Sequence, residues 1–147
     1  MLVGNKKVNF NYEILERFET GIELLGFEVK SLRNKRGSLE GSHVTVRGNE
    51  AFLIGADIPP YQQANTPEGY DPHRHRRLLL TKKELSQLTD TEHMKGLTIV
   101  PISVYNKGKK IKVEIGIVRG KKKFDKRETI KKRESDRDIH RSLKREG

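Results

Sequence analysis

The sequence predicts a mainly β fold: a small closed antiparallel barrel with two or three short helices, followed by a basic C-terminal tail. Runs of β-branched and aromatic residues alternate with turn residues over the first 118 residues, and long stretches with helical periodicity are rare there. Lys and Arg gather in the remaining residues. We therefore expect one domain at residues 1–118 and a tail at residues 119–147.

Three pairs of apolar runs predict β-hairpins. Residues 10–18 and 22–27 flank Glu19-Thr20-Gly21, residues 44–47 and 51–54 flank Gly48-Asn49, and residues 97–105 and 111–118 flank Asn106-Lys107-Gly108. Turn residues between two such runs are typical of hairpins. Closure into a barrel is expected because it removes exposed strand edges.

Two segments interrupt the strands as candidate helices. Thr81 and Glu84 have the spacing of a capping box at a helix start. Residues 28–34 fit either a strand or a helix, and Gly37 ends that segment. Between them, residues 59–77 form a loop rich in Pro, Gly, Asn and charge, long enough to be functional or mobile.

The charge of the chain points to a polyanionic partner. There are 31 Lys and Arg against 20 Asp and Glu, a formal net charge of +11, and such a field attracts polyanions. Nucleic acid is favoured over an anionic membrane, because no helical segment has a broad apolar face. The absence of Cys excludes disulfides and thiolate sites. No apolar run resembles a membrane span or a signal peptide, so we expect a cytoplasmic protein.

The tail differs in composition from the rest of the chain. Residues 119–147 hold 13 Lys and Arg against 6 Asp and Glu, whereas residues 1–118 hold 18 against 14. Its few sizeable apolar residues cannot offset a backbone ordering cost of ~1–2 kcal/mol per residue. Its Lys, Arg and Glu are good helix formers. We expect the tail to be disordered when free and helical on a partner surface.

The segment Asp71–Arg77 contains His73 and His75 beside a carboxylate, which could indicate a metal site or a general base. The neighbouring Arg residues would repel a divalent cation, so phosphate contact or a solvated loop is favoured. No nucleophile elbow, Walker A loop or dinucleotide fingerprint occurs. We expect no metal, no cofactor and no enzymatic activity; a nuclease using His73 and His75 is the alternative to test.

Basic residues interleave with Phe at residues 5–10 and again at residues 121–127. This pattern favours phosphate contact combined with base stacking. The residues alone therefore predict an RNA-binding barrel. A general ribosomal or RNA-chaperone protein would fit that description equally well.

Short sequence blocks that are distributed along nearly the whole chain carry a family resemblance. They are Tyr12-Glu13-Ile14, Glu19-Thr20-Gly21-Ile22, Gly26-Phe27-Glu28-Val29-Lys30-Ser31-Leu32-Arg33, Ile58-Pro59-Pro60-Tyr61, Asp71-Pro72, Arg77-Leu78-Leu79-Leu80, Gly96-Leu97-Thr98-Ile99-Val100-Pro101, Gly120-Lys121-Lys122 and Asp125-Lys126-Arg127. In this order they resemble the SmpB family over nearly the whole chain. That family consists of the SsrA-binding factors of trans-translation.

The resemblance implies an oligonucleotide-binding (OB) type of barrel that grips the tRNA-like domain of transfer-messenger RNA (tmRNA). It implies delivery of that RNA to stalled ribosomes, where the tail enters the decoding centre and mRNA channel, and peptides are tagged. It leaves open whether elongation factor Tu takes part in the delivery complex, and we expect a monomer. By motif, the RNA-binding positions are Asn5, Lys6, Lys7, Glu19, Leu79 and Lys112. The ribosome-engaging positions are Gly120, Lys121, Lys122, Phe124, Asp125, Lys126 and Arg127.

Three of these positions have competing interpretations. Glu19 could accept hydrogen bonds from base edges or be an ordinary turn residue of the first hairpin. Leu79 could be an apolar platform for a base or a residue of the core. Phe124 stands where the family often has His or Tyr, so a base-stacking ring is expected there rather than a proton donor, or else an apolar anchor for the tail.

Overall fold

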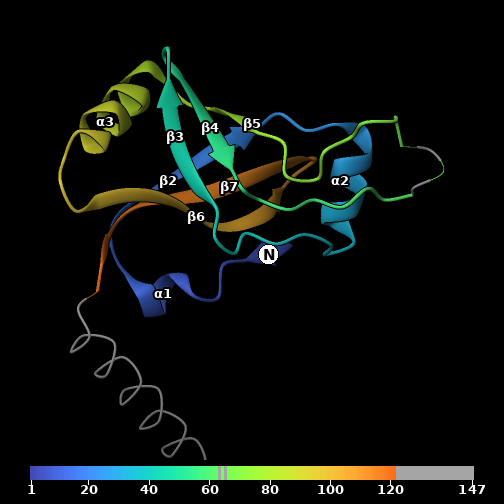
Figure 1. The fold of residues 1–147 in the computed structure, drawn as a ribbon, viewed down its shortest axis with the longest axis horizontal. Coiled ribbons are helices and arrows are strands. Elements are labelled where there is room, and N and C mark those ends of the chain that lie inside the picture. The colour runs from blue at the N-terminus through green and yellow to red at the C-terminus, as the bar shows by residue number, and fades with distance from the viewer. Residues whose placement is uncertain (63, 65, 122–147) are drawn as a thin grey trace, which may run out of the picture.

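The computed structural model describes residues 1–62, 64 and 66–121. Within them, one antiparallel sheet has seven strands in the order β1-β6-β7-β2-β5-β4-β3. The strands are β1 (Val3–Gly4), β2 (Tyr12–Ile22), β3 (His43–Arg47), β4 (Glu50–Ile54), β5 (Arg76–Leu79), β6 (Leu97–Lys107) and β7 (Lys110–Gly120). The helices are α1 (Val8–Asn11), α2 (Gly26–Arg33) and α3 (Lys82–Glu92) (Figure 1). The prediction of a mainly β antiparallel fold with short helices is confirmed.

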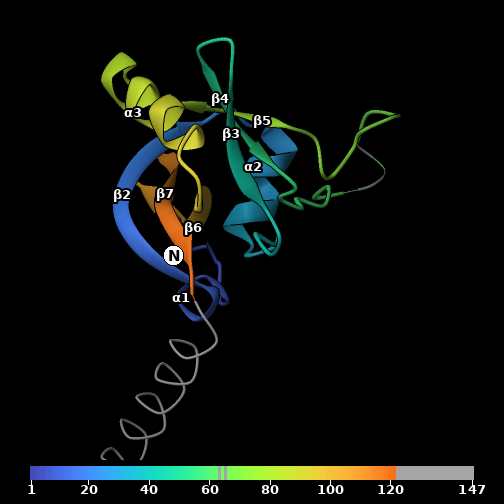
Figure 2. The same ribbon diagram turned by 60° about the vertical axis from the view of Figure 1, so that its left-hand side comes forward.

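The sheet curves strongly but does not close, so the prediction of a closed barrel is wrong. In the described part of the chain, β1 and β3 are the two edges of the sheet. Strands β3 and β6 lie in contact without pairing as a ladder, and helix α3 packs against both of them (Figure 2). Its Glu92 carboxylate accepts a hydrogen bond of 2.7 Å from the backbone N–H of Val46 in β3. A side chain therefore takes a donor that a closing strand would otherwise use.

The predicted first hairpin is also wrong, because β2 runs through Glu19-Thr20-Gly21 as one continuous strand. These residues pair in register with Glu114, Val113 and Lys112 of β7. Thr20 is buried, and its hydroxyl donates to the carbonyl oxygen of Val113 at 3.1 Å. Thr20 and Gly21, although expected in a turn, thus lie in a strand, because the long partner strand β7 pairs with them.

The other local predictions are confirmed. Arg47 pairs with Glu50 across Gly48 and Asn49, whose φ angles are +55° and +64°, as a tight hairpin turn requires. The third hairpin joins β6 to β7. Helix α3 starts with the predicted capping box of Thr81 and Glu84. The ambiguous segment at residues 28–34 is helical up to Arg33, the last residue of α2, and Asn34 is the C-cap.

Two apolar clusters hold the sheet. The larger one fills its concave side and includes Phe18, Leu53, Leu78 and Ile115. The smaller one joins Val8 of α1 to Val100 of β6 and Val118 of β7, and Tyr12 and Ile14 of β2 pack against it. None of the helices in the described part of the chain is long and apolar enough to cross a membrane.

Candidate functional site

The structure brings Glu19, Leu79 and Lys112 together; we call them the Leu79 surface. Gly21 of β2 pairs with Leu79 of β5 on one side and with Lys112 of β7 on the other. Strand β5 alternates, with Arg76 and Leu78 buried and Arg77 and Leu79 exposed. The Leu79 side chain is 49% exposed, so it does not belong to the core.

Two shallow hollows flank the Leu79 side chain. One, of about 410 Å³, lies toward α3 and includes Glu19 and Arg77 in its lining. The other, of about 340 Å³, lies toward α2 and includes Val29 and Arg33. Gly21, Leu79 and Lys112 line both hollows. An exposed apolar side chain between two hollows, with a cation beside it, offers an unstacked base a surface to pack on and a phosphate a partner.

The Glu19 carboxylate is held by neighbours on β6. Lys107 donates to one oxygen at 2.8 Å, and the hydroxyl of Tyr105 donates to the other at 2.6 Å. These hydrogen bonds, Lys107 first, hold the pKa of Glu19 below its ordinary value, and the charges of Lys107 and Lys112 act in the same direction. Burial, followed by the bond to Glu19, raises the pKa of Tyr105 to about 12. Glu19 is thus an ionised, oriented acceptor within a strand, and its interpretation as a turn residue is wrong.

Asn5, Lys6 and Lys7, which we call the Asn5 surface, lie elsewhere. The Asn5 side chain donates to the carbonyl oxygen of Pro101 at 2.9 Å. Lys7 forms an exposed ion pair of 2.6 Å with Glu40. Lys6 is exposed and belongs to none of the ion pairs within the described residues. These residues line a hollow of about 290 Å³ with Gly37 and Ser38.

The two surfaces are separated along the sheet. Gly4 pairs with Ser103, Ser103 with Glu114, and Glu114 with Glu19. At about 4.8 Å per strand, the row from Gly4 to Glu19 spans roughly 14 Å. The predicted RNA-binding residues therefore form two separate contacts rather than one cluster.

The root of the predicted tail lies beside the Asn5 surface. Strand β7 continues to Gly120, which pairs with Tyr12. The backbone N–H of Lys121 donates to the carbonyl oxygen of Asn11, and its ammonium donates to the carbonyl oxygen of Asn9. The chain thus leaves the sheet at α1, whereas the Leu79 surface lies at the opposite end of β2 (Figure 1). The remaining predicted tail positions, Lys122, Phe124, Asp125, Lys126 and Arg127, lie outside the described residues.

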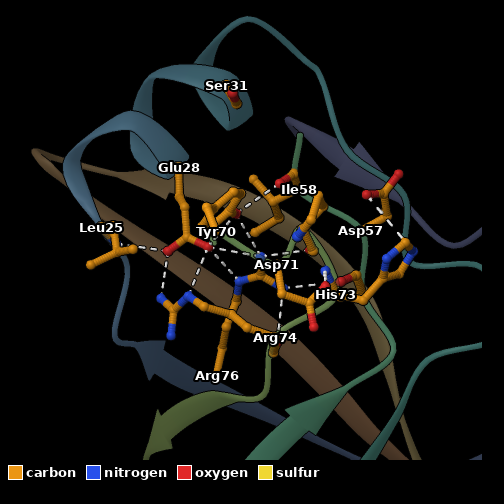
Figure 3. A network of polar contacts seen from close by, with 12 residues as sticks. Leu25, Glu28, Ser31, Asp57, Ile58, Tyr70, Asp71, His73, Arg74 and Arg76 are labelled. Carbon is orange, nitrogen blue, oxygen red and sulfur yellow. Dashed lines mark hydrogen bonds and ion pairs between the residues drawn. The ribbon is translucent and has the colours of Figure 1, made fainter. Parts of the chain in front are cut away.

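Two of the three arginines in the segment at residues 71–77, Arg74 and Arg76, turn toward α2, contrary to their interpretation as phosphate contacts. The Arg76 side chain and the Glu28 carboxylate of α2 are both fully buried and lie 2.7 Å apart. Arg74 forms a second ion pair with Glu28 (Figure 3). Exposed Arg77 lies near Glu23 and Glu50, at 3.5 and 3.4 Å.

The Glu28 carboxylate is the centre of a buried network that we call the Glu28 clamp, made of Glu28, Tyr70, Arg74 and Arg76. Burial by itself raises the pKa of Glu28, but hydrogen bonds from Arg74, the Leu25 backbone and Tyr70 outweigh it and hold that pKa below its ordinary value. The Tyr70 hydroxyl lies 2.8 Å from the Glu28 carboxylate and accepts a hydrogen bond from Arg76. Burial and the Glu28 charge raise the pKa of Tyr70 to about 12.

Helix α2 holds the long loop at both of its ends. The Ser31 hydroxyl donates to the carbonyl oxygen of Pro59, where the loop starts. The Glu28 clamp holds the other end, and the rings of Phe27 and Tyr70 meet edge to face with centroids 4.7 Å apart. The loop is therefore positioned by α2, and the network behind it was not predicted from the sequence.

The two histidines of this segment lie outside the network. His73 has Nε2 3.8 Å from a carboxylate oxygen of Asp57, and its side chain is 61% exposed. His75 is exposed as well. Across the residues that the structure describes, no three His, Asp or Glu side chains are grouped so as to hold a metal ion.

Comparison with known proteins identifies the family. The family model described as SmpB protein matches residues 2–145. The SsrA-binding protein of Mesoplasma florum is 51% identical over 140 residues, which cover 95% of this chain and 94% of that protein. The SsrA-binding protein of Microcystis aeruginosa is 46% identical over 145 residues, covering 99% and 94%.

A solved structure shares the fold. It is described as "tmRNA-SmpB: a journey to the center of the bacterial ribosome", and one of its chains is 41% identical to this one with a TM-score of 0.68. The match covers 82% of this chain and 84% of the other. Together with the family match over residues 2–145, these similarities establish that the chain belongs to the SmpB family.

Proposed function

We propose that this chain binds the tRNA-like domain of tmRNA and delivers that RNA to stalled ribosomes for trans-translation. The observation that carries the proposal is its similarity to SsrA-binding proteins over nearly its whole length. The solved neighbour described as tmRNA-SmpB on the bacterial ribosome supports it. The chain acts as a binding factor in the cytoplasm, with tmRNA and the stalled ribosome as its partners.

The Leu79 surface supplies a physical basis for RNA recognition. Leu79 offers an apolar platform to a base, Lys112 offers a charge to phosphate, and the oriented Glu19 carboxylate accepts hydrogen bonds from base edges. Lys107 and Tyr105 hold that carboxylate in place. The Asn5 surface contributes Lys6 as a second phosphate contact.

In this proposal the folded domain binds the RNA and the tail engages the ribosome. The Leu79 surface and the tail root lie at opposite ends of β2, so a base packed on Leu79 does not cover Gly120 and Lys121, from which the tail leaves. In this proposal the tail folds as a helix in the decoding centre and mRNA channel, and the ring of Phe124 stacks there.

A chain ending at Lys121 is expected to bind tmRNA within about tenfold of the full chain, which is roughly 1.4 kcal/mol. Lys121 is the right end point because its backbone and side chain are hydrogen-bonded to α1. Peptide tagging on a truncated message should disappear. Normal tagging by the shortened chain would contradict the division of labour.

Lys112→Ala and Lys6→Ala are each expected to lower the slope of log affinity against log salt by up to about one unit, because Lys acts on phosphate as a point charge. Lys82→Ala, an exposed lysine in the first turn of α3, is the matched control. Binding should be measured by fluorescence anisotropy of labelled tmRNA across a salt series. Weaker binding with an unchanged slope would indicate structural damage instead of a lost phosphate contact.

A general ribosomal or RNA-chaperone role is the competing function. Capture of RNA from a bacterial lysate followed by sequencing separates the two, since tmRNA should dominate only under the proposed function. Incubating the pure protein with RNA and Mg²⁺ or Mn²⁺ tests the nuclease alternative. Cleavage that disappears in His73→Ala or His75→Ala would overturn the assignment as a non-enzymatic factor.

A further inference from the structure

Several exposed cations in the described part of the chain are paired with carboxylates. Lys7 pairs with Glu40, Arg17 with Glu114, Lys107 with Glu19, and Arg119 with Glu13. Arg77 lies between Glu23 and Glu50. Paired charges of this kind largely cancel beyond a Debye length, so they contribute little to attracting a polyanion.

Among the described cations that are in no ion pair, six lie together across α2 and the β6–β7 turn, and we call this group the basic ridge: Lys30, Arg33, Lys35, Arg36, Lys109 and Lys110. All of them are exposed, and none belongs to an ion pair within the described residues. The one carboxylate of α2, Glu28, is fully buried and already engaged by Arg74 and Arg76. The positive charge of the ridge is therefore not neutralised by neighbouring carboxylates.

The ridge is continuous across two elements that are far apart in the sequence. The Arg33 guanidinium of α2 donates to the carbonyl oxygen of Lys109, in the turn between β6 and β7, at 2.9 Å. Arg36 donates to the carbonyl oxygen of Tyr61 at 3.4 Å, in the loop that the Glu28 clamp positions. Both guanidiniums use backbone acceptors, so they keep their full charge.

The ridge adjoins the Leu79 surface without a break. The hollow on the α2 side of Leu79 is lined by Arg33, Lys109 and Lys110 as well as by Leu79 and Lys112. An RNA strand whose base packs on Leu79 would thus meet unpaired cations on leaving that contact. Cations at the C-terminal end of α2 stabilise the helix, which accounts for Lys30 and Arg33. The same explanation does not apply to Lys109 and Lys110, because they lie outside the helix.

We propose that the basic ridge is a further phosphate-contact surface, along which the RNA backbone runs from the Leu79 surface toward the C-terminal end of α2. The inference rests on the proposed function, since it concerns the path of the same RNA. It assigns to the ridge contacts with phosphate alone, because Lys and Arg side chains on an exposed helix and turn fix no base edge. Ridge substitutions should therefore weaken binding to every RNA by a similar factor.

The test compares matched double substitutions in the full chain. Lys109→Gln/Lys110→Gln and Lys30→Gln/Lys35→Gln each remove two charges from the ridge, whereas Lys82→Gln/Lys83→Gln removes two exposed charges from α3. Binding of labelled tmRNA is measured between about 50 and 300 mM salt, with bulk tRNA as a second probe. Each ridge pair should lower the salt slope by about one to two units, at roughly 0.7–0.9 per phosphate lost, and the α3 pair by less than about half a unit.

The possible outcomes distinguish a failure of the ridge proposal from a failure of the proposed tmRNA-binding function. Equal slope losses in all three double variants would show a general charge effect and overturn the ridge. So would an unchanged slope in both ridge variants when the wild-type chain still prefers tmRNA to bulk tRNA. A wild-type chain that binds both RNAs equally would instead overturn the proposed function. Loss of tmRNA preference in a ridge variant at an unchanged slope would contradict a role in phosphate contact.

Discussion

Replacing Glu28 by Ala is expected to lower the free energy of unfolding by about 3–5 kcal/mol, because it leaves a buried cation without its partner. The Arg76 side chain is fully buried, and its remaining acceptors are carbonyl oxygens and the Tyr70 hydroxyl. The same substitution frees Arg74 and removes the acceptor for the Leu25 backbone. The loss should appear as a lower urea midpoint in unfolding followed by circular dichroism.

Glu40→Gln is the matched control, since it breaks the exposed ion pair with Lys7. An exposed pair contributes little, so the urea midpoint should hardly move. Equal effects of Glu28→Ala and Glu40→Gln would contradict the central role of the clamp.

The clamp also predicts how stability depends on pH. The pKa of Glu28 is lowered in the folded state, so its contribution is present above its unfolded pKa of about 4.3 and is lost as the pH falls through the folded pKa. Glu28→Gln removes this titration. The variant should therefore lose less stability than the wild type between pH 5 and pH 3, although it starts from a lower value.

Local sequence signals predicted those elements whose determinants are close together in the chain. The Gly48-Asn49 turn and the Thr81 capping box depend on neighbouring residues, and both occur as expected. Strand β2 was misjudged at Thr20 because its pairing is set by Val113, far along the chain. The predicted closure of the barrel was wrong for a similar reason. The hydrogen bond between Glu92 and Val46 depends on the packing of α3 against β3, which local sequence signals do not give.

The candidate site divides in the same way. The family resemblance provided Glu19, Leu79 and Lys112, and the structure places them around Gly21. The resemblance could not provide the roles of Arg74 and Arg76. A charged segment of this kind is expected to be exposed, and the partner of both arginines, Glu28, lies 46 to 48 residues away in the sequence. The available signal was the single carboxylate on α2, Glu28, three residues after Leu25 at the helix start.

A second large effect, on the affinity for tmRNA, is expected from a substitution in the Leu79 surface. Leu79→Asp should weaken binding of tmRNA by more than about tenfold, which is roughly 1.4 kcal/mol, because it removes an apolar platform and places a negative charge near phosphate. The side chain is 49% exposed, so folding should be little affected. A strand position exposed to water tolerates such a change at a cost of about 1 kcal/mol or less.

Leu15→Asp is the matched control for this substitution. Leu15 is 45% exposed and lies at the bulge of β2, toward the end that carries α1 and the tail root. Both Asp variants lose a similar apolar surface and gain the same charge, so their urea midpoints should be alike. Their affinities for labelled tmRNA should differ, because only Leu79 lies between the two hollows and beside Lys112. If Leu15→Asp weakened binding as much as Leu79→Asp, net charge rather than a contact at Leu79 would govern affinity. A Leu79→Phe variant completes the series, since a ring that stacks on a base should retain binding where Asp loses it.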